Sequence, residues 1–133
     1  NYEAITEQLE LLTNTKVVYD ESVSDKEKAN RIIDTVSKLS GVPVSTMLSF
    51  NRHRSVVIAR QVATYLIKDN THYSLKQIGQ IVSNGKPKHH ATMIHSVQAV
   101  LDSYWTAKNT NTETDTYRLV EQAKDMLAGS YKF

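Results

Sequence analysis

The chain contains no cysteine among its 133 residues, which excludes disulfides, thiolate zinc sites and a cysteine nucleophile. No stretch approaches the ~20 consecutive apolar residues of a membrane-spanning helix, and no basic segment followed by an apolar one opens the chain as a signal peptide would. These absences predict a cytoplasmic protein without a membrane partner. The length is that of about one domain. The chain opens on Asn1 rather than Met, as a fragment of a longer protein would.

Acidic residues are scarce in the middle of the chain. Residues 35–108 carry nine Lys and Arg against two Asp, a net charge of +7, whereas residues 1–34 carry −4 and residues 109–133 carry −1. A basic section of this kind is typical of a protein that binds a polyanion. A solvated basic face without a partner is the alternative, and charge by itself does not separate the two.

Strand-like alternation is also missing, and apolar residues recur at helical spacing along the whole chain. The patterns S-x-x-E at Ser24 and S-x-x-Q at Ser74 are those of capping boxes. The sequence therefore predicts an all-α fold of five or six helices. We expect the helices over about 1–13, 24–40, 56–69, 74–82, 89–105 and 113–128, the last of them ending at Gly129.

Two units are predicted along the chain: an acidic amphipathic helix with a polar linker over residues 1–23, and a domain over residues 24–133. Hydrophobic residues make up 40% of the sequence, enough for a core. The residues expected to face that core are Ala29, Ile32, Ile33, Val36, Leu39, Ile58, Val62, Tyr65, Leu66, Leu75, Ile78, Ile81, Val82, Met93, Val97, Val100, Leu101, Tyr104, Val120, Ala123 and Leu127.

The densest chemistry lies in "GKPKHHATMIHS", residues 85–96, which holds two lysines, three histidines and no carboxylate. Helical residues three or four positions apart can face one metal ion. His89, His90 and His95 are one, five and six positions apart, so their side chains diverge around a helix. No Asp or Glu lies nearby to orient a metal ligand. We predict no metal site here.

Nucleotide binding and acid–base catalysis are not predicted either. A Walker A loop needs G-x-x-x-x-G-K-[ST], whereas Gly85-Lys86 is followed by Pro87 and no glycine stands five positions before Gly85. Acid–base catalysis would use a partnered carboxylate and a nucleophile, and the stretch offers neither. We expect a protein without enzymatic activity and without a cofactor.

The arrangement of the predicted helices favours a different function for the stretch. A short helix over 74–82, a glycine-containing loop and a long helix starting near His89 form a helix-turn-helix pattern. In such motifs the amino end of the second helix meets base edges in the major groove. Lys86 and Lys88 would add charge beside the phosphates. Ordinary packing of a helical hairpin is the alternative.

A second basic element precedes the predicted 56–69 helix. The segment "SFNRHRSVVIARQ", residues 49–61, places Arg52 and Arg54 before the helix and Arg60 on its polar face. An arginine on a loop can enter a narrow minor groove, where the negative potential is enhanced. The alternative is that these arginines only keep the loop in solvent.

Taken in order, these features resemble the C-terminal DNA-binding domain of the bacterial chromosomal replication initiator DnaA. The motifs A-R-Q-V-A-T-Y-L at 59–66, S-L-K-Q-I-G at 74–79 and H-A-T-M-I-H-S at 90–96 are similar to the family's A-R-x-x-A-x-Y-L, S-L-x-x-I-G and H-T-T-V-x-H-A. The resemblance covers about residues 24–128. It implies an all-α helix-turn-helix domain that binds double-stranded DNA in a sequence-specific manner.

The resemblance also implies a role for individual positions. Arg52 matches the loop arginine that reaches the minor groove. His90 and Ala91 match the base-reading turn of the recognition helix, and Thr92 matches a threonine that contacts phosphate. The positions that match contacts near the phosphate backbone are Arg54, Arg60, Gln61, Lys68, Leu75 and Lys76.

The chain departs from the family pattern at the start of the recognition helix. His89 stands where the family has Asp, Ala91 stands where it has the first threonine, and the loop between the two helices is about three residues longer. An Asp carboxylate can accept a hydrogen bond from cytosine N4, and neither a neutral histidine nor an alanine methyl does the same job. The resemblance therefore carries the fold, whereas it does not carry the family's usual target sequence.

We predict a nucleoid-associated DNA-binding domain, either part of a larger initiator or a free-standing DnaA-like protein. Helix 89–105 would read the major groove, and the basic segment over residues 50–55 would read the minor groove. Two alternatives stay open: a Trp-repressor-like transcriptional regulator, and a helical protein-interaction module. In the second, the apolar stripe Tyr2, Ile5, Leu9 and Leu12 would dock a protein partner.

Overall fold

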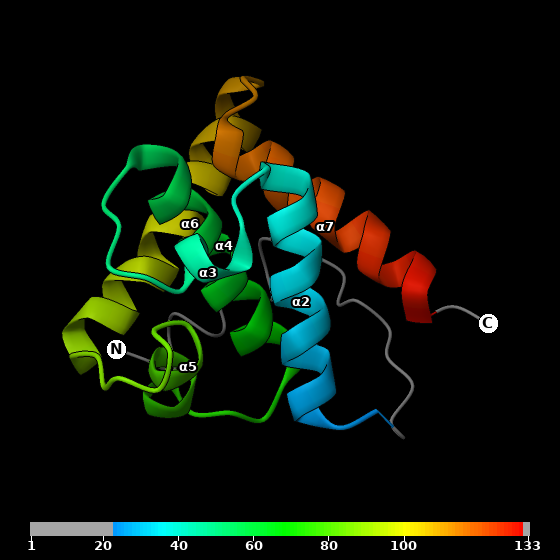
Figure 1. Cartoon of the computed structure of the whole chain (residues 1–133). Coiled ribbons are helices and arrows are strands. Elements are labelled where there is room, and N and C mark those ends of the chain that lie inside the picture. The colour runs from blue at the N-terminus through cyan, green and yellow to red at the C-terminus, as the bar shows by residue number, and fades with distance from the viewer. Residues whose placement is uncertain (1–22, 132–133) are drawn as a thin grey trace.

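The structure of the protein, a computed structural model, describes residues 23–131. Within them the chain forms α-helices and no strands, so the predicted all-α fold is confirmed (Figure 1). The predicted helix over 1–13 and almost all of the linker lie outside the described residues. The helices are α2 (Asp25–Ser40), α3 (Val44–Met47), α4 (Arg54–Asn70), α5 (Leu75–Ile81), α6 (His90–Thr110) and α7 (Asp115–Tyr131).

Serine caps open two of these helices, as the sequence predicts. At α5 both halves of the capping box form: the Gln77 amide donates to Ser74 Oγ at 3.2 Å, and the Ser74 amide donates to Gln77 Oε1 at 2.8 Å. At α2 the Glu27 amide donates to Ser24 Oγ at 3.2 Å, but the Glu27 carboxylate accepts from Arg31 at 2.7 Å. A neighbouring arginine one turn away thus diverts the carboxylate from the cap.

The boundaries differ from the prediction in several places. The helix α4 begins at Arg54, two residues before the predicted start. The short α3, with buried Met47, was not predicted, because four residues are too few to show a helical period. The helix α7 continues through Gly129 to Tyr131, so the predicted end at Gly129 was wrong. A glycine within a helix costs only about 1 kcal/mol relative to alanine.

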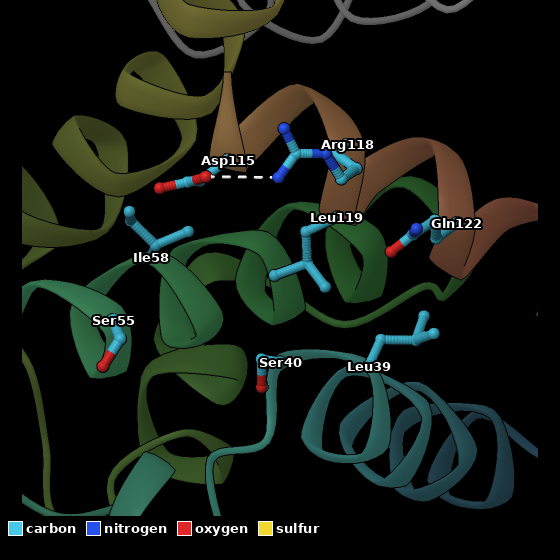
Figure 2. Close-up of a pocket in the computed structure, with 8 residues that line it drawn as sticks. All are labelled: Leu39, Ser40, Ser55, Ile58, Asp115, Arg118, Leu119 and Gln122. Carbon is cyan, nitrogen blue, oxygen red and sulfur yellow. Dashed lines mark hydrogen bonds and ion pairs between the residues drawn. The ribbon is translucent and has the colours of Figure 1, made fainter. Parts of the chain in front are cut away.

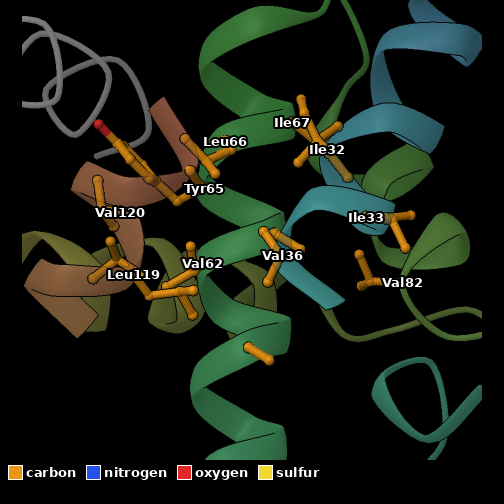
Figure 3. Packing of buried hydrophobic residues seen from close by; sticks show 14 of the residues in the cluster. Ile32, Ile33, Val36, Val62, Tyr65, Leu66, Ile67, Val82, Leu119 and Val120 are labelled. Carbon is orange, nitrogen blue, oxygen red and sulfur yellow. The ribbon is translucent and has the colours of Figure 1, made fainter. Parts of the chain in front are cut away.

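The helix α4 is the centre of the domain, and all five of the other described helices contact it. Figure 3 shows Ile32 and Val36 of α2 on one side of it, and Leu119 and Val120 of α7 on the other. Of the residues predicted to face the core, all are buried except Leu39, Ile58 and Ile81, which are half-buried against it. Because α4 is covered on several sides, the segments at its two ends are held in fixed places.

The helices α6 and α7 close the bundle through a polar contact at their inner faces. The Tyr104 hydroxyl donates to the Glu121 carboxylate at 2.8 Å, and the rings of Tyr104 and Tyr117 lie 5.0 Å apart. Burial and this hydrogen bond raise the pKa of Tyr104 above its usual range. This contact lies away from the first turn of α6, whose side chains are exposed. Among residues 23–131 no helix is long and apolar enough to cross a membrane.

Candidate nucleic-acid interface

The helices α5 and α6 form the predicted helix-turn-helix, and Gly79 sets how closely they approach. A Cβ atom at this position would lie 3.2 Å from Met93 Sδ and 3.3 Å from Lys88 Cβ. Both distances are shorter than ordinary van der Waals contacts between these atoms. The glycine of the S-L-K-Q-I-G motif therefore lets the start of α6 pack directly on α5.

The turn between the two helices is held by its own hydrogen bonds. The buried hydroxyl of Ser83 bonds to the carbonyl oxygens of Gly79 and Lys86, and the Gly85 amide donates to the Gln80 carbonyl at 2.7 Å. Asn84 and Gly85 both have positive φ, 56° and 83°, a conformation that asparagine and glycine adopt most readily. The turn thus carries Lys86 and Lys88 in a defined geometry.

The first turn of α6 projects out of the domain. His89 is its N-cap and gives no side-chain cap, and His89, His90, Ala91 and Thr92 are all exposed. Met93 is the first buried residue of the helix. The backbone amides of an uncapped first turn are unsatisfied by the helix itself and favour an anion. The geometry expected of a recognition helix is therefore present at this end of α6.

The loop before α4, residues 48–53, is also ordered by local hydrogen bonds. The Asn51 amide donates to Ser49 Oγ at 3.2 Å, and the His53 amide donates to Asn51 Oδ1 at 2.8 Å. Arg52 and the first helical residue Arg54 are exposed. An asparagine side chain bonded two residues ahead is an Asx turn, which fixes a tight bend without secondary structure. We call this segment the basic loop.

The basic loop and the helix-turn-helix loop lie against each other. Lys86 Nζ lies 4.9 Å from the centre of the Phe50 ring, which is 64% exposed. Burial is the main cause that lowers the pKa of Lys88, and the positive charge of nearby Arg60 is the second. The two elements that the sequence singled out separately therefore form one surface, on the side of the domain where the starts of α4 and α6 lie (Figure 1).

Other predicted residues lie along α4 and at the start of α5. Arg54, Gln61 and Lys68 are seven positions apart, so they form one stripe along the helix. Arg54 is exposed, and Gln61 and Lys68 are half-buried. Burial lowers the pKa of Lys68, and neighbouring Asp69 opposes this. Lys76 is exposed in the first turn of α5.

Two predicted residues have their side chains engaged within the domain. Leu75 is 3% exposed and packs in the core, so only its backbone remains for a contact with DNA. Arg60 turns its guanidinium toward the basic loop, where it donates to the carbonyl oxygens of Met47, Ser49 and Asn51. Spacing along the helix placed Arg60 on a polar face but did not reveal these bonds.

A separate cleft of about 280 Å³ lies between α2, α4 and α7 (Figure 2). Its lining combines apolar and polar side chains, and Arg118 Nη1 lies 3.4 Å from the Asp115 carboxylate. It is lined by Leu39, Ser40, Ser55, Ile58, Asp115, Arg118, Leu119 and Gln122. None of the predicted DNA-contacting residues is among them, and the cleft is at the small end for a ligand site. It does not contribute to the candidate interface.

Chelation with excess EDTA is expected to leave both helical content and duplex binding unchanged. Within residues 23–131 no group of three or more histidine, cysteine, aspartate or glutamate side chains comes together as a metal site, and structural zinc needs such a set of ligands. Circular dichroism and fluorescence anisotropy before and after chelation measure the two properties. Loss of either one, restored by added zinc, would contradict the argument from histidine spacing.

Comparison with known proteins places these features in one family. The family model of the bacterial dnaA protein helix-turn-helix matches residues 29–100. The chromosomal replication initiator protein DnaA of Bacteroides fragilis is 41% identical over 69 residues, which are 52% of this chain and 14% of that protein. The same-named protein of Chloroflexus aggregans is 30% identical over 90 residues, 68% of this chain and 18% of that protein.

A third DnaA, from Bifidobacterium animalis subsp. lactis, is 32% identical over 103 residues, 77% of this chain and 16% of that protein. The chain therefore spans less than a fifth of the length of these relatives. No solved structure matches it. The match over residues 29–100 runs from α2 into α6 and includes both loops and the first turn of α6. The chain belongs to the family of the bacterial DnaA helix-turn-helix domain.

Proposed function

We propose that this DnaA-family domain binds double-stranded DNA and reads sequence through both grooves. The first turn of α6 would enter the major groove, and Arg52 would reach the adjacent minor groove. The observation that carries the proposal is the contact of Lys86 with the Phe50 ring at 4.9 Å. It joins the two loops into one surface, so a single duplex can meet both.

Most of the affinity would come from phosphate contacts, which release condensed counterions. The five cations assigned to phosphates are Arg54, Lys68, Lys76, Lys86 and Lys88. Gln61, Thr92 and the backbone of Leu75 would add neutral hydrogen bonds. Contacts of this kind set the position and register of the protein and carry no sequence information by themselves.

Base recognition is assigned to the exposed residues His89, His90 and Ala91. An alanine methyl can contact the methyl group of thymine, and a neutral imidazole offers one donor and one acceptor. Neither repeats the way in which a carboxylate accepts from cytosine N4. We propose that the preferred sequence differs from that of relatives with Asp at the position of His89.

The relatives are named chromosomal replication initiator proteins. We propose that this domain supplies DNA recognition for a process of that kind. The mechanism is binding: the described residues would hold DNA and position whatever is joined to the domain.

Selection of bound sequences from a random duplex library tests the proposal most directly. The wild-type protein is expected to enrich one short sequence, because the surface offers direct base contacts as well as phosphate contacts. His89→Asp is the matched variant, and its selected sequence is expected to gain cytosine at one position. A library that stays random after repeated selection would leave only non-specific binding.

A further inference from the structure

Arg60 has a set of contacts that differs from those of the other basic residues on this surface. Its Nε donates to the Met47 carbonyl at 2.8 Å, and its Nη2 donates to the Ser49 carbonyl at 2.7 Å and the Asn51 carbonyl at 2.9 Å. Three of the five guanidinium N–H groups are therefore used within the protein. These carbonyls lie nine to thirteen positions earlier in the chain.

The acceptors of Arg60 follow the path of the chain from α3 into the basic loop. Met47 ends α3 and is buried, and Asn51 immediately precedes Arg52. A loop without secondary structure leaves its carbonyls without regular partners, and each needs a donor where it is shielded from water. One guanidinium supplies donors to three of them and thereby fixes the approach of the chain to Arg52.

The planar shape of the guanidinium is essential to this arrangement. Its donors point in fixed directions from a rigid fork, whereas a lysine ammonium is a single point on a flexible stem. A lysine at position 60 would keep the charge but could not reach three carbonyls spread over five residues with the same geometry. The single substitution Arg60→Lys therefore keeps the positive charge while it removes the set of carbonyl contacts.

Arg60 also lies beside the helix-turn-helix loop. The pKa of Lys88 is lowered by burial and by the positive charge of Arg60, and burial lowers the pKa of Arg60 itself. No carboxylate of the described residues forms an ion pair with Arg60. A half-buried cation is thus held by neutral carbonyls at the junction of the two loops.

We infer that Arg60 is a positioning residue, whose three carbonyl contacts hold the basic loop so that Arg52 meets the minor groove in register with α6. This inference rests on the proposed function, and it assigns Arg60 a task other than the phosphate contact implied by family resemblance. Pre-ordering the loop lowers the entropy lost when Arg52 is immobilised on DNA. The consequence is greater discrimination between sequences rather than greater general attraction.

The test compares Arg60→Lys with the wild type on the duplex selected above and on a random duplex. Binding to the selected duplex is expected to fall about tenfold, within the range of one good base contact. Binding to random DNA and the salt dependence should stay unchanged, because the charge remains. Arg118→Lys is the matched control, since Arg118 also contacts protein groups but lies at the cleft in Figure 2; it should leave both affinities unchanged.

The outcomes separate the inference from the proposed function. If the wild type itself does not distinguish the two duplexes, sequence-specific binding is wrong. If the wild type does, but Arg60→Lys binds both duplexes like the wild type or weakens on both equally, the positioning role is overturned.

A second, uncharged variant covers the case in which Arg60→Lys fails to fold. Ser49→Ala removes the hydroxyl that accepts from the Asn51 amide and donates to the Thr46 carbonyl, and it changes no charge. It should lower the preference for the selected duplex in the same direction by a smaller factor. An unchanged preference in folded Ser49→Ala would contradict a role for loop order in recognition.

Discussion

Raising the salt concentration from 50 to 200 mM is expected to weaken duplex binding roughly 500-fold. The log of the binding constant falls with the log of salt concentration with a slope of about −0.9 for each phosphate that a cation neutralises. Five cations are assigned to phosphates, which gives a slope of about −4.5. A fourfold change in salt then gives the stated loss. Fluorescence anisotropy with a labelled duplex at several salt concentrations measures the slope.

The same titration separates DNA binding from the protein-interaction alternative. A complex formed through apolar helix surfaces depends only weakly on salt, because burial of apolar area is not screened by ions. A random duplex should give a slope close to that of the selected one, since phosphate contacts carry no sequence information. A slope near zero would show that the net charge of +7 over residues 35–108 is a solvated face without a polyanion partner.

The fold was largely predictable because the strongest signals are local. Ser74 and Gln77 are three positions apart, which is the spacing of a capping box, and the structure forms both of its reciprocal bonds there. The apolar stripes of α2 and α6 likewise follow from the helical period. Of the three predicted core residues that are only half-buried, Leu39 and Ile58 line the cleft between α2, α4 and α7. Periodicity identifies the inward face of a helix but not a gap between neighbouring helices.

The candidate interface was predictable as two basic segments but not as one surface. The contact of Lys86 with Phe50 joins residues 36 positions apart, and no helical or turn pattern connects them. The bonds from Arg60 to the basic loop are likewise not indicated by any local pattern, because they depend on how α4 and α3 cross. Leu75 was expected both to face the core and, from its family position, to lie near phosphate. Its side chain is 3% exposed, as the first expectation requires, which leaves only its backbone for the second.

The sequence alone gives no physical reason for a glycine at position 79, beyond the fact that a helix can tolerate one. The structure supplies the reason, since any side chain there would meet Met93 and the stem of Lys88. This close approach fixes where the helix-turn-helix loop begins relative to α6. It also means that Lys88 holds its Cβ against α5.

Arg52→Ala and Lys88→Ala are expected to weaken DNA binding in different ways. Arg52 is exposed on the basic loop, and if it makes a good base contact its loss should cost ~1–3 kcal/mol on the selected duplex. Random DNA should be affected less. Lys88→Ala should weaken all duplexes about equally and reduce the salt slope by roughly one, because an ammonium contacts phosphate as a point charge. Anisotropy titrations of both variants on both duplexes, at one salt concentration, measure the difference.

Neither substitution is expected to disturb the fold. Arg52 is exposed and no core contact depends on it, and alanine at position 88 keeps the Cβ atom that packs near Gly79. Circular dichroism should therefore show unchanged helical content before binding is compared. The two variants are expected to differ because the proposed function has one side chain entering a groove and the other neutralising a phosphate. If both folded variants lost selected and random binding in the same proportion, reading through two grooves would be wrong, and a non-specific basic patch would be enough to explain the affinity.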